Sequence, residues 1–199
     1  MNVKGRKAEQ SEATRGALLG VARELFAERG YAAVPTEEIV QRAGVTRGAL
    51  YHHFKDKRAL FRAVVDELEQ ETVERIATSA LAEGDPWQMQ LTALNAYLDV
   101  CLDPAVQTIV LVDAPSVLGP AEWREIEATY GLALVRMGLE AVMEAGLIER
   151  QPLEPLSHLV LGALSEAGLM IARADDQRKA RREVGESVER LLEGLRVRP

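Results

Sequence analysis

Residues 36–54 read TEEIVQRAGVTRGALYHHF, and this stretch decides the fold of the first quarter of the chain. Its apolar residues have the spacing of two short helices that share one inward side: Ile39, Val40, Ala43, Val45 and Leu50. Gly44 stands between the two helices, where a tight turn requires the positive φ that glycine adopts without strain. Two short helices that meet at a glycine cross steeply. The stretch therefore predicts a helix-turn-helix.

The second helix of this motif has a polar outer face. Its outward residues are Thr46, Arg47, Gly48, Ala49, Tyr51, His52 and His53. A helix of this size can enter a DNA major groove about 12 Å wide. Gly48 costs about 1 kcal/mol relative to alanine inside a helix, and a close approach to another surface would justify that cost. We therefore expect this face to bind DNA.

Residues beside the motif extend the candidate DNA-binding set. Lys55, Lys57 and Arg58 come at the start of the next helix, a position suited to phosphate contacts. Thr36 is available as the N-cap of the first short helix. The candidate set is thus the outer face together with Thr36, Lys55 and Lys57.

Each of these groups also has a simpler interpretation. Phe54 is expected in the core, and Tyr51 is as compatible with the core as with the surface. The pair His52 and His53 does not predict a metal site, since adjacent helix residues point about 100 degrees apart and no cysteine or carboxylate cluster accompanies them. Taken alone, the basic run after Phe54 could be a solvated surface.

The charge distribution along the chain is uneven. The net charge is −7, but residues 1–62 carry +5 and residues 63–199 carry −12. A cationic segment on an anionic remainder indicates a local surface for a polyanion. On charge alone, chance unevenness is an equally good explanation.

Apolar residues recur at helical spacing almost throughout the chain, with glycine and proline at the breaks. About nine helices are expected, near residues 11–29, 37–43, 47–53, 57–82, 86–102, 105–114, 121–145, 156–174 and 177–195. The predicted fold class is all-α. A three-helix head (residues 1–56) precedes a larger helical body (residues 57–199).

Composition narrows the location and the class of protein. Cys101 is the only cysteine, which fits a reducing cytoplasm. The first ten residues are polar and basic, and no apolar stretch is expected to reach the roughly 18 residues that span a membrane. No P-loop, G-x-S-x-G, H-E-x-x-H or G-x-G-x-x-G motif is present. The sequence therefore predicts neither an enzyme, nor a cofactor, nor a bound metal.

The body carries two further patterns. Apolar stripes on its last two helices suggest a dimer interface with these residues: Leu159, Ala163, Ala167, Ile171, Val184, Val188, Leu191 and Leu195. The same stripes could instead face only their own core. The middle helices combine aromatic, sulfur-containing and isolated polar side chains, as a small-molecule pocket does. The candidates are Tyr97, Cys101, Trp123, Met137, Met143 and His158. For any single one of them an ordinary core position is the simpler interpretation, and Cys101 is expected to be a small core residue rather than a nucleophile.

Two segments resemble the TetR family of bacterial regulators: GVTRGALYHHFKDKRALF (44–61) and LLGVARELFAERGYAAV (18–34). The resemblance covers roughly residues 12–72 and is specific, because many positions match at fixed spacing over three helices. It implies that the residues at Thr46, Arg47, Gly48, Tyr51 and His52 face DNA and that Lys57 contacts a phosphate. It also implies dimerisation through the last two helices.

The chain departs from the family pattern at two positions. Pro35 stands where members often have a capping threonine, so Thr36 would have to cap the helix. Val40 stands where members usually have alanine, which would set the two helices slightly further apart.

The resulting prediction is a cytoplasmic homodimer, associated with the nucleoid when bound to DNA, whose two heads bind a palindromic operator. A small apolar ligand, neutral or cationic, is expected to bind in the body and release the DNA. Repression rather than activation is implied by the resemblance alone. A ligand-binding protein that no longer binds DNA, or an enzyme on a helical scaffold, would be the alternatives.

Overall fold

The computed structural model describes residues 3–197, with side chains described from residue 8 onward, and this part of the chain is almost entirely helical. In chain order the elements are α1 (Val3–Ala33), α2 (Thr36–Arg42), α3 (Arg47–His53), α4 (Lys57–Ala80), α5 (Pro86–Val100), η1 (Val106–Asp113), α6 (Ala114–Glu127), η2 (Ala128–Leu132), α7 (Ala133–Glu144), α8 (Leu153–Ala172) and α9 (Gln177–Glu193), where η marks π-helical turns. Within residues 3–197 the only β-type pairing is one antiparallel bridge between Ile148 and Arg196. The all-α prediction is confirmed.

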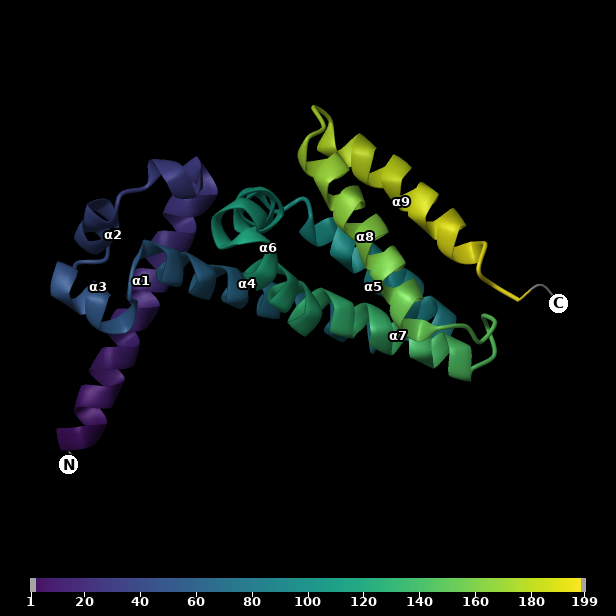
Figure 1. Ribbon diagram of the computed structural model, residues 1–199, viewed down its shortest axis with the longest axis horizontal. Helices are drawn as coiled ribbons and strands as arrows, with labels where there is room; N and C mark the ends of the chain where they lie inside the picture. The colour runs from purple at the N-terminus through teal and green to yellow at the C-terminus, as the bar shows by residue number, and fades with distance from the viewer. Residues whose placement is uncertain (1–2, 198–199) are drawn as a thin grey trace.

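Helices α1–α3 form one end of the molecule, and α8 and α9 lie side by side towards the other end (Figure 1). Helix α4 runs from the head into the body. Helix α1 starts at Val3, eight residues before the expected start, and its regular turns end at Gly30, whose φ of +75° breaks the helix. Gly44 has a φ of +65° at the turn between α2 and α3, as the sequence predicts.

Side-chain caps fix the starts of several helices. The Thr46 hydroxyl accepts the Ala49 N–H at 3.1 Å and opens α3, as predicted. The Asp85 carboxylate accepts the Gln88 N–H at 2.9 Å and opens α5. The prediction for Thr36 is wrong: Pro35 occupies the N-cap of α2 without a side-chain bond, and Thr36 lies one residue inside the helix, where its hydroxyl bonds Glu37 at 3.2 Å.

The middle of the body departs from the expected helix boundaries. Pro115 does not end a helix: the π-helical turns of η1 run directly into α6 with helical φ/ψ at Asp113 and Ala114, and Pro115 is the second residue of α6. The break comes instead at Gly119, with a φ of +78°. The single helix expected over residues 121–145 is α6 and α7 joined by the π-helical turn η2.

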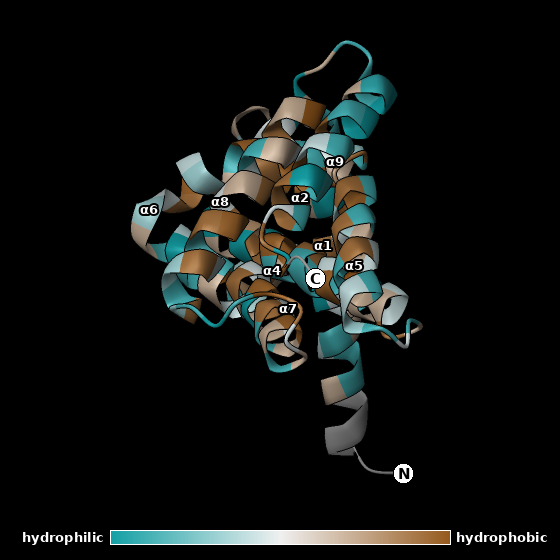
Figure 2. Ribbon diagram, turned by 90° about the vertical axis from the view of Figure 1, so that its right-hand side faces the viewer, coloured by the Kyte–Doolittle hydropathy of each residue, from teal (hydrophilic) through white to brown (hydrophobic). Residues whose placement is uncertain are grey.

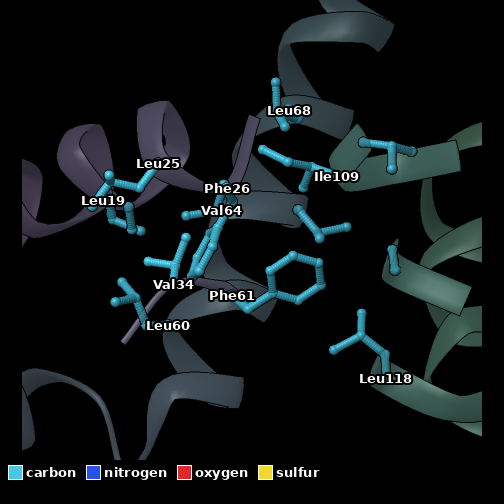
Figure 3. Close-up of a cluster of buried hydrophobic side chains, with 14 of the residues drawn as sticks. Leu19, Leu25, Phe26, Val34, Leu60, Phe61, Val64, Leu68, Ile109 and Leu118 are labelled. Atoms are coloured by element: carbon cyan, nitrogen blue, oxygen red, sulfur yellow. The ribbon is translucent and has the colours of Figure 1, made fainter. Parts of the chain in front are cut away.

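The head and the body share one hydrophobic core. Leu25 and Phe26 of α1, Phe61 of α4, Ile109 of η1 and Leu118 of α6 belong to the same buried cluster (Figure 3). Phe54 is buried in it, as predicted. A second cluster lies among α5, α7, α8 and α9. The head thus packs on the body through apolar side chains. The predicted boundary between head and body, at residues 56 and 57, remains a prediction.

Helix α8 corrects the expectation that no apolar stretch is long enough to span a membrane. It has 20 residues and is apolar enough, by length and composition, to cross a membrane. It nevertheless packs against α7, α9 and η1. Figure 2, which views the molecule from the side of α9, shows apolar residues along α8.

Candidate nucleic-acid interface and ligand cavity

Helix α3 presents the outer face that the sequence predicts. Buried Leu50 fastens its inner side to the core, while Thr46, Arg47, Gly48 and His52 are exposed. Tyr51 is 42 % exposed, which places its ring on the outer face rather than in the core. Ala49 and His53 are half-buried. Most of the predicted face is therefore accessible to a partner.

Arg47 and Tyr51 are held beside each other on this face. The Arg47 guanidinium carbon lies 5.5 Å from the centre of the Tyr51 ring, within the range of a cation–π contact. Arg47 also forms an ion pair with Glu37 of α2, with N and O 3.3 Å apart. Because both members of this pair are exposed, it contributes little to stability and a phosphate or base could replace Glu37.

Lys57 is half-buried rather than free on the surface. Its ammonium donates to the Tyr31 carbonyl and lies 4.0 Å from the centre of the Tyr31 ring. Burial lowers the pKa of Lys57, and nearby Asp113 opposes that shift. Lys55, by contrast, is exposed. The phosphate role of both lysines stays a prediction, and Lys57 has a structural contact besides.

A set of polar contacts, which we call the latch, joins the head and the first turn of α4 to η1 and α6: Tyr31, Arg58, Asp113, Val117, Leu118 and Glu122. The Tyr31 N–H donates to the Asp113 carboxylate at 2.6 Å. The Arg58 guanidinium donates to the carbonyls of Val117 at 3.1 Å and Leu118 at 2.6 Å and pairs with Glu122. Arg58 therefore points to the body, which corrects its expected place among the phosphate contacts.

The body contains two adjoining cavities that are partly open to the surface, of about 100 Å³ and about 150 Å³. Both are lined by Glu69, Thr72, Tyr97, Gly131 and Leu161, so we describe them as two lobes of one ligand cavity. The larger lobe reaches α6 at Trp123 and Glu127, and the smaller one lies between α4, α5, α7 and α8. Apart from a few polar groups, its walls are aliphatic and aromatic.

Of the six predicted ligand-binding residues, only some line the cavity. Tyr97 and Trp123 line the cavity. Cys101 does not line it, but lies buried beside Tyr97. The other three do not line this cavity: Met137 is 61 % exposed on α7, Met143 is packed in the second core cluster, and the exposed His158 faces Glu154. Their part in ligand binding stays a prediction. Helical spacing alone does not separate the sides of α7 and α8.

Glycine permits the packing behind the cavity. A Cβ on Gly168 would lie 2.9 Å from the Tyr97 hydroxyl oxygen and 3.1 Å from the Cys101 sulfur. The absence of a side chain there lets the Tyr97 hydroxyl donate to the Leu164 carbonyl of α8 at 3.2 Å. Burial raises the pKa of Tyr97 well above its ordinary value and raises the pKa of the Cys101 thiol to about 11. Both groups are neutral at physiological pH, and the thiol is no nucleophile.

Glu69 is a cavity residue that the sequence pattern did not single out. It lies on α4 one turn after Val65, three residues before Thr72 and seven before Ile76, so it shares their inward face. That spacing is the signal for its position, although a glutamate is by residue type expected on the solvent side. Burial, with Glu127 and Asp66 nearby, raises its pKa from 4.5 to about 7.

Only part of the predicted dimer interface is on the surface. Ala167, Ile171 and Val184 are buried in the protomer's own core, although Ala167 and Val184 also line the surface groove between α8 and α9, and their part in dimerisation stays a prediction. Leu159 and Leu191 are 72 % and 57 % exposed. The three others are half-buried: Ala163, Val188 and Leu195.

The exposed side of α8 and α9 also has the shape of a helix-packing surface. A surface groove of about 460 Å³ runs between the two helices, with Ala163 and Met170 on one wall and Val188 on the other. A Cβ on the exposed Gly162 would meet nothing within 4 Å, so a second helix could approach closely there.

Sequence comparison relates both parts of the chain to known regulators. Residues 18–64 match the tetR family of bacterial regulatory proteins, and residues 87–195 match the tetracyclin repressor-like C-terminal domain. The Transposon Tn10 TetC protein of Escherichia coli is 27 % identical over 81 % of this chain and 82 % of its own length. The transcriptional regulator TtgR of Pseudomonas putida is 34 % identical over 52 % of this chain and 50 % of its own.

Solved structures extend the likeness to the whole molecule. A TetR-family transcriptional regulator from Pectobacterium atrosepticum has a TM-score of 0.82 and 33 % identity, covering 96 % of this chain and 98 % of its own. RolR in complex with resorcinol shares the fold, with a TM-score of 0.71 and 22 % identity over 92 % of this chain and 89 % of its own. TtgR and the Pectobacterium atrosepticum protein are transcriptional regulators, not enzymes. The chain belongs to the TetR family of transcriptional regulators.

Proposed function

We propose that the protein is a ligand-responsive repressor that binds a palindromic operator as a homodimer. The observation that carries the proposal is the outer face of α3, where Arg47, Tyr51 and His52 are exposed on a helix anchored by buried Leu50. A helix held in this way can place several side chains on base edges in a major groove. Repression is favoured by repressors among the relatives, such as Rv1474c of Mycobacterium tuberculosis, which is 44 % identical over 36 % of each chain.

The second part of the proposal is the dimer. The exposed apolar positions Leu159, Met170 and Leu191, together with the small Gly162, suit packing against the same surface of a second copy. Such pairing would give a two-fold axis, and the operator would mirror it with two inverted half-sites. We place this activity in the cytoplasm.

The third part is release from DNA by a small ligand. Helix α4, η1 and α6 line the ligand cavity, and the same three elements carry the latch to the head. A ligand that prefers one arrangement of these elements would shift the position of α3 through the Tyr31–Asp113 and Arg58 contacts. A ligand with equal affinity for both arrangements would change nothing, so the cavity must differ between the free and DNA-bound states.

Selection of binding sites from random double-stranded DNA tests the proposal. The expected product is an enriched sequence of two inverted half-sites whose centres are about one helical turn, or a multiple of it, apart. The variant Arg47→Ala should fail to enrich the same bases, with an unchanged melting temperature. Absence of any enriched sequence would exclude specific operator binding, and an enriched site without inverted symmetry would exclude the dimer.

A further inference from the structure

Glu69 is a carboxylate without a protein partner inside the ligand cavity. It lines both lobes, and no hydrogen bond or ion pair joins it to any side chain or backbone group in residues 8–197. In the same part of the chain no buried side-chain oxygen is sealed off without a partner, so the half-buried Glu69 keeps accessible oxygens while it lines both lobes. A buried charged group that lacks a partner costs free energy, and proteins rarely keep one without a function.

The electrostatics of the cavity point to one sign of ligand charge. Glu127 provides a second carboxylate at the end of the larger lobe, and burial raises its pKa as well. No lysine, arginine or histidine is among the residues that line either lobe. The cavity therefore favours a cation and repels an anion.

The walls define the rest of the ligand. Trp123 and Tyr97 offer aromatic surfaces near the carboxylates, and aromatic faces attract cations. The smaller lobe is closed by Leu134, Val135 and Leu139, which suit an apolar group. The two lobes, about 150 Å³ and about 100 Å³, set the size of a small molecule with one ring or a short chain.

We propose that the ligand is a small apolar cation, such as an arylalkyl amine, whose ammonium group binds the Glu69 carboxylate while its apolar end fills the smaller lobe. This proposal names the class of ligand for the release mechanism proposed above. Only the effect of the ligand on operator binding rests on that proposed function; binding of the cation in the cavity does not. A cation replaces the water that the buried carboxylate loses, whereas a neutral molecule of the same shape leaves Glu69 uncompensated.

Three probes with one skeleton and different charges test the proposal: 4-phenylbutylamine, 4-phenylbutanol and 4-phenylbutyrate. Their affinities are measured by isothermal titration calorimetry at pH 7.5 with the full chain and no DNA. The amine should bind at least about tenfold more tightly than the alcohol, as expected for a charge-assisted contact, and the carboxylate should not bind. Equal binding of amine and alcohol, or no binding of the amine at millimolar concentration, would overturn the proposal.

Matched variants locate the contact. Glu69→Gln should weaken amine binding about tenfold or more and leave alcohol binding unchanged. Glu74→Gln, which removes an exposed carboxylate from the same helix, should bind the amine like the wild type. Amine binding that survives Glu69→Gln, or that falls equally in Glu74→Gln, would contradict the assignment.

Operator affinity measured with and without the amine separates this inference from the proposed function. If the amine binds through Glu69 and operator affinity stays the same, the regulatory mechanism fails while the ligand assignment holds. If operator binding is specific but only the neutral or anionic probe releases it, the proposed function holds and the cation assignment fails.

Discussion

Single residues of the head carry different parts of the free energy of DNA binding. Arg47 is exposed beside Tyr51, so it can reach a base edge without disturbing the core. If Arg47 bonds a base edge, Arg47→Ala should weaken operator binding by about 1–3 kcal/mol and change the preferred base at one position. Competition binding with operators substituted one base pair at a time measures both effects. Equal weakening on all sequences would reduce Arg47 to a phosphate-binding residue.

Lys57 and Lys55 separate phosphate binding from structural support. Each Lys→Ala variant should weaken binding to every sequence and lower the salt dependence of log K by about 0.9 for each phosphate that the side chain neutralises. Only Lys57→Ala should also lower the melting temperature, because Lys57 bonds the Tyr31 carbonyl and packs on its ring. Fluorescence anisotropy at several salt concentrations gives the slopes. An unchanged slope in Lys57→Ala would leave that residue a purely structural role.

Glu69 should make stability depend on pH in a particular window. Its pKa is about 7 in the fold against 4.5 as the ordinary value, since burial and two nearby carboxylates, Glu127 and Asp66, disfavour its charge. Below pH 4.5 it is neutral in both states. From there to pH 7 the unfolded chain loses the proton and the folded chain keeps it, so the wild type loses stability relative to Glu69→Gln, by at most about 3 kcal/mol.

Thermal unfolding of the two proteins between pH 4 and pH 8.5 measures this difference. The melting temperatures should nearly coincide at the acid end and separate as pH rises, with Glu69→Gln the more stable. A separation that is the same at every pH would mean that Glu69 is ionised in the fold without penalty.

At the scale of elements, the side-chain cap of α3 contributes to the stability of the protein. Thr46 accepts the Ala49 N–H, so Thr46→Ala should cost about 1 kcal/mol of stability, whereas Thr46→Ser keeps the hydroxyl and should cost less. Urea unfolding of both variants tests the difference. Equal destabilisation in the two would show that the threonine methyl, not the cap, is what matters.

Element types and most boundaries could be predicted because local signals decide them. Apolar periodicity marks the helices, and glycines at 30, 44 and 146 adopt the positive φ that ends them. The wrong boundaries have tertiary causes. Pro115 is a helix stop by residue type, yet the helix continues through it from η1 into α6. Thr36 is a good cap by residue type, yet Pro35 occupies the cap position.

The outer face of α3 could be predicted from residues 36–54, because one short segment contains it. The ligand cavity could not, since it is assembled from α4, α5, η1, α6, η2, α7, α8 and α9, and no local pattern tells which side of each helix meets the others. Residue type gives two kinds of error here. It favours Met137 and His158, which do not line the cavity, and it disfavours Glu69, which does.

At the scale of the whole molecule, assembly should depend on the exposed side of α8 and α9. Ala167→Glu is a poor test of the dimer, because Ala167 is buried in the protomer's own core and the variant would disturb the fold. Leu159→Glu is better, since Leu159 is 72 % exposed. It should give folded monomers by light scattering and a large decrease in operator affinity, because a single head binds only one half-site.

A matched control exists at Leu81, which is equally exposed at the end of α4, outside the α8–α9 surface. Leu81→Glu should remain dimeric. If Leu159→Glu stays dimeric as well, the interface lies elsewhere on the molecule.

The proposed function requires that two copies of this chain place their α3 helices in successive major grooves of one operator. Hydroxyl-radical footprinting on the site obtained by selection tests this arrangement most directly. We expect two protected patches related by two-fold symmetry, with centres about one helical turn or a multiple of it apart. A single protected patch, or protection without two-fold symmetry, would contradict it.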